Sequence, residues 1–249
     1  MSQFTTRIIK GGALLAETRR LLDVWNEDVE GTLSRLHASE TFGKTRARQK
    51  DILMVLRRRF LDVGYEVAEA LKRLANDPTA FRQACYYEAA RTDGLLSAFA
   101  AGPLFSWYRQ GHREVSTADV VSWLGTDSRS RVWNPRTRER VARGLLSTLR
   151  DFGLLEGTAR GRRKRIRVPQ LSLRAFGYVA LRERPRCSSD RALLQAPVWR
   201  WFLLDEQAVR KLFLEADRAG VLRFSEAGRL LRVDWLVRDL QEAVDVFPA

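Results

Sequence analysis

Hydrophobic side chains recur at three- and four-residue steps through most of the first 110 residues, which is the spacing of amphipathic α-helices. Short stops rich in Gly, Asn, Asp and Pro separate these segments. The gaps are short enough for a compact antiparallel bundle. The expected helices cover residues 13–26, 29–36, 44–63, 66–74, 79–90 and 95–110.

The pattern changes between residues 112 and 170. Ser116, with Asp119 three residues later, is a capping-box-like start for a short amphipathic helix. Asn134 and Pro135 start a longer helix, because Asn caps helix N-termini and the first helical position does not need the N–H that Pro lacks. One face of this longer helix is an apolar stripe, and the opposite face is rich in arginine.

An apolar pair, a Gly-containing turn and a basic strand with alternating apolar residues follow, which predicts a β-hairpin that ends at Pro169. Helix, turn, helix and hairpin in this order are typical of a winged helix-turn-helix. A second hairpin is expected at 221–233, after helices at 173–182, 190–203 and 206–218 and before a terminal helix at 234–246. Its tip lacks an arginine cluster, which favours a packing or dimer role.

The predicted fold is therefore mainly α, a helical bundle followed by a winged helix-turn-helix region with short β-hairpin wings. The expected domains are an N-terminal bundle at 1–111, the winged helix-turn-helix at 112–170, and C-terminal helices with the second hairpin at 171–249.

Charge changes this picture, because it is concentrated in the winged region. The 249 residues include 44 Lys and Arg against 30 Asp and Glu, a formal net charge of +14. The segment 129–167 supplies +10 of that excess. Such an excess favours a polyanionic partner, since Arg and Lys release condensed counterions from phosphates. An arginine-rich genome composition would also raise the arginine content.

The expected DNA contacts lie on the longer helix and on the hairpin. The first turns of recognition helices usually reach base edges, so Arg136 and Arg140 are expected there, with Thr137 beside them and Arg143 on a phosphate. The wing is expected to lie along the backbone or in the minor groove. Its candidate contacts are Arg160, Arg162, Arg163, Lys164, Arg165 and Arg167.

A second set of cations lies in the predicted helix 44–63. A solvated helical face is the more common explanation for such charges, and a second phosphate-contacting surface is the alternative. The residues of this possible second basic surface are Lys44, Arg46, Arg48, Arg57 and Arg58.

Among the sequence motifs that could indicate an enzyme, the most specific is the segment 38–45. It matches a relaxed form of the phosphate-binding loop pattern, with Ala38 in place of the first Gly. That mechanism needs a strand before the loop, whereas residues 33–37 have helical character. The segment is therefore expected to cap a helix.

No catalytic residue, metal site or cofactor is expected. His37 and His112 have no Cys or carboxylate at ligand spacing, and Cys85 and Cys187 belong to no CxxC pair. We expect reduced thiols in the cytoplasm.

No signal peptide or membrane crossing is expected either. The longest apolar stretch, 94–108, is interrupted at Gly102-Pro103 and falls short of the roughly 20 residues that a span requires.

The N-terminal stretch 8–19, with Leu21, Leu22, Trp25 and the arginine-rich segment 45–59, resembles the BrxA family of bacterial BREX phage-resistance systems. The resemblance covers mainly residues 8 to about 110. It implies a cytoplasmic, non-enzymatic, mostly helical protein with a fold compared to that of NusB. It also implies DNA binding beside separate methyltransferase, ATPase and phosphatase components. It carries no residue-level active site.

The function expected from these observations is double-stranded DNA binding within a BREX system, with other BREX components as possible partners. RNA binding through the N-terminal bundle is one alternative. A protein-assembly scaffold and a transcriptional regulator are the others.

Overall fold

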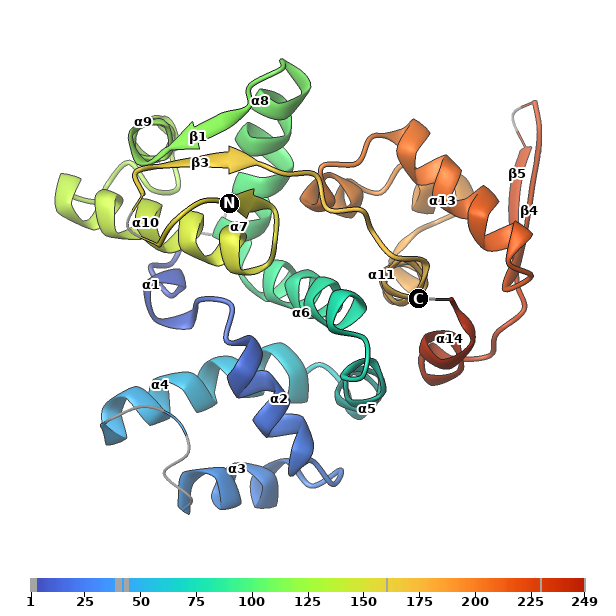
Figure 1. Ribbon diagram of the computed structural model, residues 1–249, viewed down its shortest axis with the longest axis horizontal. Coiled ribbons are helices and arrows are strands. Elements are labelled where there is room, and N and C mark those ends of the chain that lie inside the picture. Colours follow the sequence, from blue (N-terminus) through green and yellow to red (C-terminus); the bar gives the residue numbers. More distant parts are fainter. Residues whose placement is uncertain (1–3, 39–41, 43–44, 160, 229, 249) are drawn as a thin grey trace.

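The computed structural model describes residues 4–38, 42, 45–159, 161–228 and 230–248. The fold is mainly α-helical with a few short antiparallel strand pairs, as predicted (Figure 1). Its first part consists of α1 (Ile8–Gly11), α2 (Leu15–Asp23), α3 (Val29–Ala38), α4 (Arg46–Leu56), the π-helical turn η1 (Arg57–Leu61), α5 (Tyr65–Leu74), α6 (Pro78–Thr92), α7 (Gly94–Phe99), the π-helical turn η2 (Ala100–Leu104) and α8 (Phe105–Arg109).

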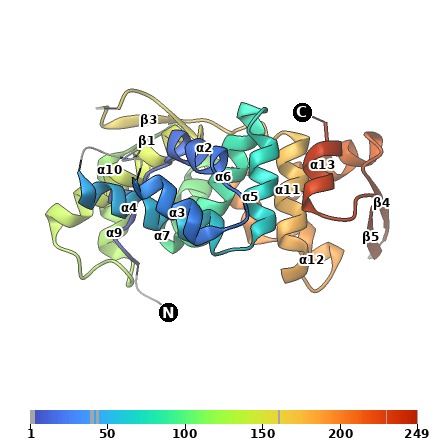
Figure 2. The same cartoon turned by 90° about the horizontal axis from the view of Figure 1, so that it is seen from below.

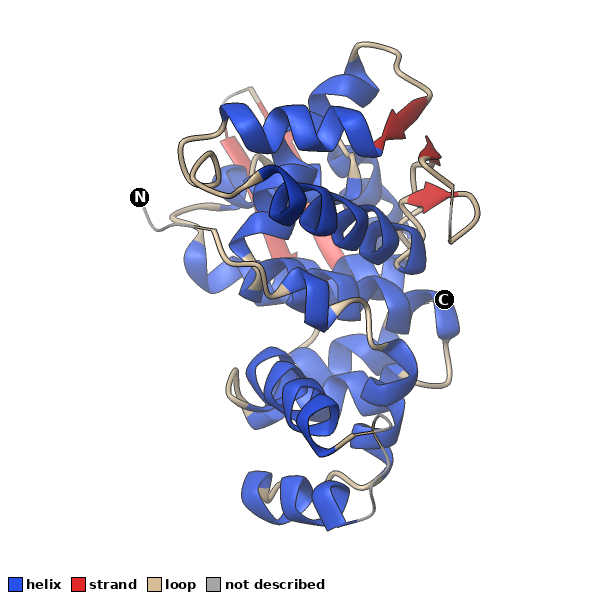
Figure 3. Cartoon of the chain, turned by 90° about the vertical axis from the view of Figure 1, so that its left-hand side faces the viewer, coloured by secondary structure: helices blue, strands red, loops and turns tan. Residues whose placement is uncertain are grey.

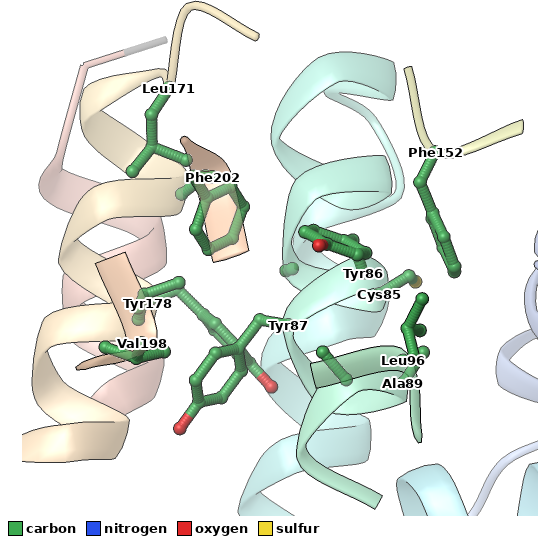
Figure 4. Packing of buried hydrophobic residues seen from close by; sticks show 14 of the residues in the cluster. Cys85, Tyr86, Tyr87, Ala89, Leu96, Phe152, Leu171, Tyr178, Val198 and Phe202 are labelled. Carbon is green, nitrogen blue, oxygen red and sulfur yellow. The ribbon is translucent and has the colours of Figure 1, made fainter. Parts of the chain in front are cut away.

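Helix α6 lies at the centre of the molecule and is buried on nearly every side. The side chains of Asp77 and Asp93 accept backbone N–H bonds at the starts of α6 and α7. Helix α6 packs against α5, α7 and α11 (Leu173–Glu183). Figure 4 shows Tyr86 and Tyr87 of α6 among aromatic rings from distant segments. The Tyr86 ring meets Phe202 edge to face, with ring centroids 5.2 Å apart.

A buried carboxylate links α6 to α11. Glu88 is fully buried and accepts hydrogen bonds from the Tyr178 hydroxyl and Arg182 Nε, both at 2.9 Å. Arg91 Nε donates to its other oxygen at 3.2 Å. Burial opposes the charge on Arg182, yet Glu88 and the neighbouring tyrosines raise its pKa overall. The ion pair therefore satisfies a carboxylate that would otherwise be costly to bury.

The middle of the chain forms β1 (Glu114–Ser116), α9 (Thr117–Thr126), α10 (Pro135–Asp151), β2 (Leu155–Glu156) and β3 (Arg163–Ile166). Both predicted helices are present, and the capping box between Ser116 and Asp119 is formed. The three strands form one antiparallel sheet in the order β1-β3-β2. Strand β1 was not predicted from the sequence, because three residues are too few to show an alternating pattern.

The loop between β2 and β3 is anchored by Lys164, which the sequence pattern predicts to contact DNA. Side chains alternate along β3, so Arg163 and Arg165 are exposed whereas Lys164 is 3% exposed. Lys164 Nζ donates to the carbonyls of Thr158, at 2.6 Å, and Gly161, at 3.1 Å. Burial, with the nearby Arg150 charge, lowers the pKa of Lys164. This ammonium group therefore fixes the loop from inside and is not presented at the surface.

The C-terminal part continues from α11 and ends with a second hairpin and a short helix. Two expectations are corrected there. The predicted helix 190–203 is divided, because Pro197 starts a 3-10 turn after α12 has ended. The predicted terminal helix 234–246 begins at Leu240, since residues 234 and 235 extend the hairpin. The elements are η3 (Arg184–Arg186), α12 (Asp190–Leu194), η4 (Pro197–Phe202), α13 (Glu206–Arg218), β4 (Leu222–Ala227), β5 (Leu230–Trp235) and α14 (Leu240–Val246).

The N-terminal segment contacts both the middle part of the chain, through α9 and α10, and the helical bundle, through α4. Phe4 packs against Trp123 of α9, and the guanidinium of Arg129 lies 4.0 Å from the Phe4 ring centre. Helix α1 then packs against α10 and α4, and at the other end of the bundle α14 packs against α5. Figure 2 shows the elongated row of helices from below. Contacts thus cross residue 111, and the three-domain division stays a prediction.

We expect Glu88→Gln to lower the free energy of unfolding by about 3 kcal/mol, because it leaves Arg182 and Arg91 without their buried counter-charge. Chemical denaturation measures the loss. The matched control is Glu139→Gln, which removes an exposed pair with Arg143 and should change stability by less than about 0.5 kcal/mol. Equal effects of the two substitutions would show that the Glu88 cluster is not a stabilising link.

Lys164→Met should destabilise the protein by about 1–2 kcal/mol, because the Thr158 and Gly161 carbonyls lose a charged donor. Amide exchange at Gly161 should also accelerate. Arg165→Met, at the exposed neighbouring position of β3, is the control and should have little effect. Unchanged exchange in the Lys164 variant would contradict the anchoring role.

Candidate nucleic-acid interface

Helix α10 is the longest helix of the described chain and begins where its cap residues predict. The Asn134 side chain accepts a hydrogen bond from Thr137 N at 2.8 Å, and Pro135 occupies the first helical position. Its inner face is fully buried and includes Val141, Leu145 and Leu149. This burial determines which face of α10 remains in solvent.

The outer face of α10 carries a row of arginines. Arg136, Arg140 and Arg143 are exposed and lie on one face because they are four and three residues apart. Thr137 is half-buried at the edge of this row. Among the residues that the structure describes, neither Arg136 nor Arg140 forms an ion pair, whereas Arg143 pairs with Glu139 one turn earlier. We call Arg136, Arg140 and Arg143 the α10 stripe.

The described residues of the wing loop, 157–159, 161 and 162, lie beside the Arg143 end of the α10 stripe. Arg143 and Leu146 of α10, with Ala159 and Arg162 of the loop, line a hollow of about 380 Å³. The Arg162 carbonyl accepts a hydrogen bond from Thr117 N at 2.9 Å, which holds the loop against the start of α9. The structure therefore brings Arg143 and Arg162 to the same hollow.

The other arginines of the wing have carboxylate neighbours. Arg165 lies directly opposite Glu114 on β1 and Glu156 on β2. Arg163 is 3.7 Å from the Glu114 carboxylate, and Arg167 is 3.8 Å from that of Glu156. All three arginines remain exposed. Their positive charge is therefore partly balanced on the outer face of the sheet, and the predicted Arg160 contact lies outside the described residues.

The possible second basic surface is divided by the structure. Arg46 and Arg48 are exposed in the first turn of α4, and Arg48 Nη1 donates to the Lys10 carbonyl of α1 at 2.6 Å. Arg57, beyond the end of α4, pairs with Glu30 at 2.9 Å and Asp62 at 3.0 Å. Arg58 is half-buried, and its burial lowers its pKa. Lys44 lies outside the described residues.

The position of α1 beside α10 was not predicted from the sequence. A Cβ atom at Gly144 would lie 3.5 Å from the Ile8 carbonyl oxygen, so the two backbones approach closely. Arg7 and Lys10 of this segment are exposed. The available signal was Gly144 itself, because a glycine inside a strongly helical pattern often marks a close approach.

The structure can also be compared with the sequence motifs for phosphate binding, metal binding and membrane spanning. Residues 29–38, before the phosphate-loop-like segment, form helix α3, and Thr45 caps α4 by accepting from Arg48 N at 3.2 Å. Residues 39–41, 43 and 44 lie outside the described residues. In the described part of the chain, His, Cys, Asp and Glu side chains form no group suited to a metal ion. No helix there has both the length and the apolarity to span a membrane.

The second hairpin differs from the wing in the way that its charged side chains are paired. Arg223 pairs with Asp217 at 3.9 Å, and Arg232 pairs with Asp234 at 2.8 Å. Glu226 on β4 accepts ion pairs from Arg191 and Arg210. This hairpin therefore presents balanced charges, unlike the α10 stripe.

Comparisons with known proteins place this geometry in a family. The fold resembles the crystal structure of an uncharacterized protein from Magnetospirillum magneticum, with 20% sequence identity and a TM-score of 0.61. The match covers 80% of this chain and 98% of that one. No curated protein sequence matches significantly. The BrxA family model matches residues 2–182, so the chain belongs to the BrxA family and is a BREX-associated protein.

Proposed function

We propose that this protein binds double-stranded DNA, with α10 in the major groove and the wing loop on the adjacent backbone. The observation that carries the proposal is the α10 stripe. Among the described residues, Arg136 and Arg140 of this stripe have no acidic partner, and an arginine on a solvent-facing helix can donate two hydrogen bonds to guanine or phosphate.

The arrangement around α10 supports the same proposal. The order of helix α9, helix α10 and hairpin, with β1 added to the hairpin strand β3, is that of a winged helix-turn-helix. Arg136 and Arg140 lie in the first two turns of α10, where recognition helices usually contact base edges. Thr137 lies at the edge of the stripe, and Arg143 and Arg162 are assigned to phosphates. Lys164 is left out because its ammonium group is engaged within the loop.

The remaining expectations form part of this proposal. The protein is a cytoplasmic DNA-binding component of phage defence, and it acts as a binder without catalytic groups of its own. Other BREX proteins supply the enzymatic steps. The Arg163, Arg165 and Arg167 side chains contribute less than the α10 stripe, because Glu114 and Glu156 compensate part of their charge.

Replacing Arg136, Arg140, Arg143 and Arg162 with Ala should weaken binding to a DNA duplex about 100-fold. The slope of log affinity against log salt should fall by about 0.9 for each phosphate that is no longer neutralised. Fluorescence anisotropy across a salt series measures both quantities.

The control for that variant removes four exposed charges from the C-terminal part, namely Lys211, Arg218, Arg223 and Arg232. It should retain nearly the wild-type slope. Equal losses in the two variants would mean that only net charge matters. Preference of the wild type for an RNA hairpin over the duplex would favour the RNA alternative, and absence of nucleic-acid binding would favour a scaffold.

Glu139→Gln should strengthen DNA binding about two- to fivefold at low salt, because it removes the negative charge that faces Arg143 on the α10 stripe. The gain should shrink as salt rises. Glu215→Gln, at an exposed position on α13, changes the net charge equally and should have little effect. If the two variants bind equally well, the α10 stripe does not face the DNA.

A further inference from the structure

We propose that a hollow between the start of α6, the end of α10 and the segment 167–170 binds a phosphate group. The hollow has a volume of about 580 Å³, which is within the range of about 300–1,000 Å³ for small-molecule sites. Three arginines from separate segments line it, namely Arg82 of α6, Arg150 of α10 and Arg167 after β3. The inference goes beyond the proposed contact between the α10 stripe and DNA and does not depend on it.

The first support is the unpaired charge of Arg82. Arg82 is exposed, and among the described residues it forms no ion pair and no hydrogen bond. Its Nε and Cζ atoms are 3.7 and 3.8 Å from the position that a Cβ atom at Gly153 would occupy. The guanidinium group therefore reaches from α6 to the turn after α10, where it lines the hollow without a paired carboxylate.

The second support is that the other two arginines retain donors for a ligand. Arg167 and the Glu156 carboxylate are 3.8 Å apart, which is too far for a hydrogen bond. Arg150 donates through Nε and Nη2 to Asp151 and Ser147, whereas its Nη1 has no hydrogen-bond partner within the described part of the chain. Three arginines thus meet two carboxylates, Glu156 and Asp151, and the charge around the hollow remains positive.

Phosphate is the anion that suits this arrangement. A phosphate group has three acceptor oxygens that point in different directions, so guanidinium groups on separate walls can all donate to it. A carboxylate has only two oxygens, which lie in one plane. Arg82, Arg150 and Arg167 come from separate walls of the hollow, and the hydroxyl group of Thr79 adds a further donor. The ligand class is therefore a phosphate ester.

The third support is that hydrogen bonds hold the walls of the hollow in place. Gln83 is 4% exposed, and its Nε2 donates to the Gln170 carbonyl at 2.8 Å. Arg167 N donates to the Leu154 carbonyl at 2.8 Å. The segment 167–170 forms neither a helix nor a strand, so Figure 3 colours it as loop, and it runs from β3 to α11 in Figure 1. Such a preorganised site loses less conformational entropy when it binds.

Two sources can supply the phosphate group. Arg150 follows Arg136 and Arg143 at seven-residue steps, which are nearly two whole turns, so the three share one face of α10. The hollow thus lies at the C-terminal end of the face that carries the α10 stripe. The ligand is either a free phosphate ester or a backbone phosphate of a duplex that follows this face.

The first experiment measures thermal unfolding of the full chain with inorganic phosphate or adenosine monophosphate at constant ionic strength. At a ligand concentration about ten times Kd, the wild-type Tm should rise by about 3–6 °C. Arg82→Gln should lose most of this rise, whereas the matched control Arg218→Gln, at an exposed position on α13, should retain it. The comparison of variants removes the general stabilisation that phosphate gives to proteins. Glu156→Gln, which removes a carboxylate from the hollow, should tighten binding about two- to fivefold.

The second experiment measures the affinity of Arg82→Gln and Arg218→Gln for a 30-base-pair duplex across a salt series. If a DNA phosphate occupies the hollow, the slope of log affinity against log salt should be smaller by about 0.9 in Arg82→Gln alone.

The outcomes separate this proposal from the proposed function. Loss of the phosphate-dependent rise in Tm in Arg82→Gln alone supports a free phosphate ester, and a reduced slope in Arg82→Gln alone supports a DNA phosphate. If Arg82→Gln equals Arg218→Gln in both experiments, the phosphate site is overturned. The proposed function fails on a different result, namely that the wild type binds no duplex, and the Tm experiment then still tests the hollow.

Discussion

The arrangement of the molecule depends on a buried arginine that holds the N-terminal turn. Arg59 is 1% exposed, and its Nη1 donates to the Gly12 carbonyl at 2.9 Å. Burial lowers the pKa of Arg59 to about 10, while the nearby Asp93 carboxylate favours its charge. Gly12 has a φ of +47°, and a Cβ at Gly11 would lie 3.2 Å from Arg59 Nη2. The glycine pair is therefore required by the turn and by the close guanidinium.

This turn determines what lies beside the α10 stripe. Because the chain turns at Gly12, α1 packs against α10 and α4 while α2 enters the bundle (Figure 1). Ile8 is 1% exposed in the contact with α10. The N-terminal stretch that resembles BrxA proteins is thus explained by packing: it connects the helix that carries the arginines to the rest of the fold.

Local signals were sufficient to predict α10, because its cap, its buried stripe and its exposed arginines follow from residues within one helix. The same holds for the capping box at Ser116. The roles of Lys164 and Glu114 could not be predicted in this way. Lys164 is turned inward by the alternation of β3, and Glu114 becomes a neighbour of Arg165 only when β1 joins the sheet. The ion pair between Glu139 and Arg143 could be predicted from the sequence, because the two residues are four positions apart on one helix.

The two hairpins show why net charge alone does not identify a binding surface. Both follow an amphipathic helix and a glycine, and both carry arginines on their strands. At the second hairpin, acidic residues in α13, β4 and β5 pair with Arg223 and Arg232 of the strands and with Arg210 of α13. Binding a polyanion there would require breaking those pairs, whereas Arg136 and Arg140 would lose only water. The arrangement of carboxylates, more than the number of arginines, therefore distinguishes α10 as the proposed DNA-binding surface.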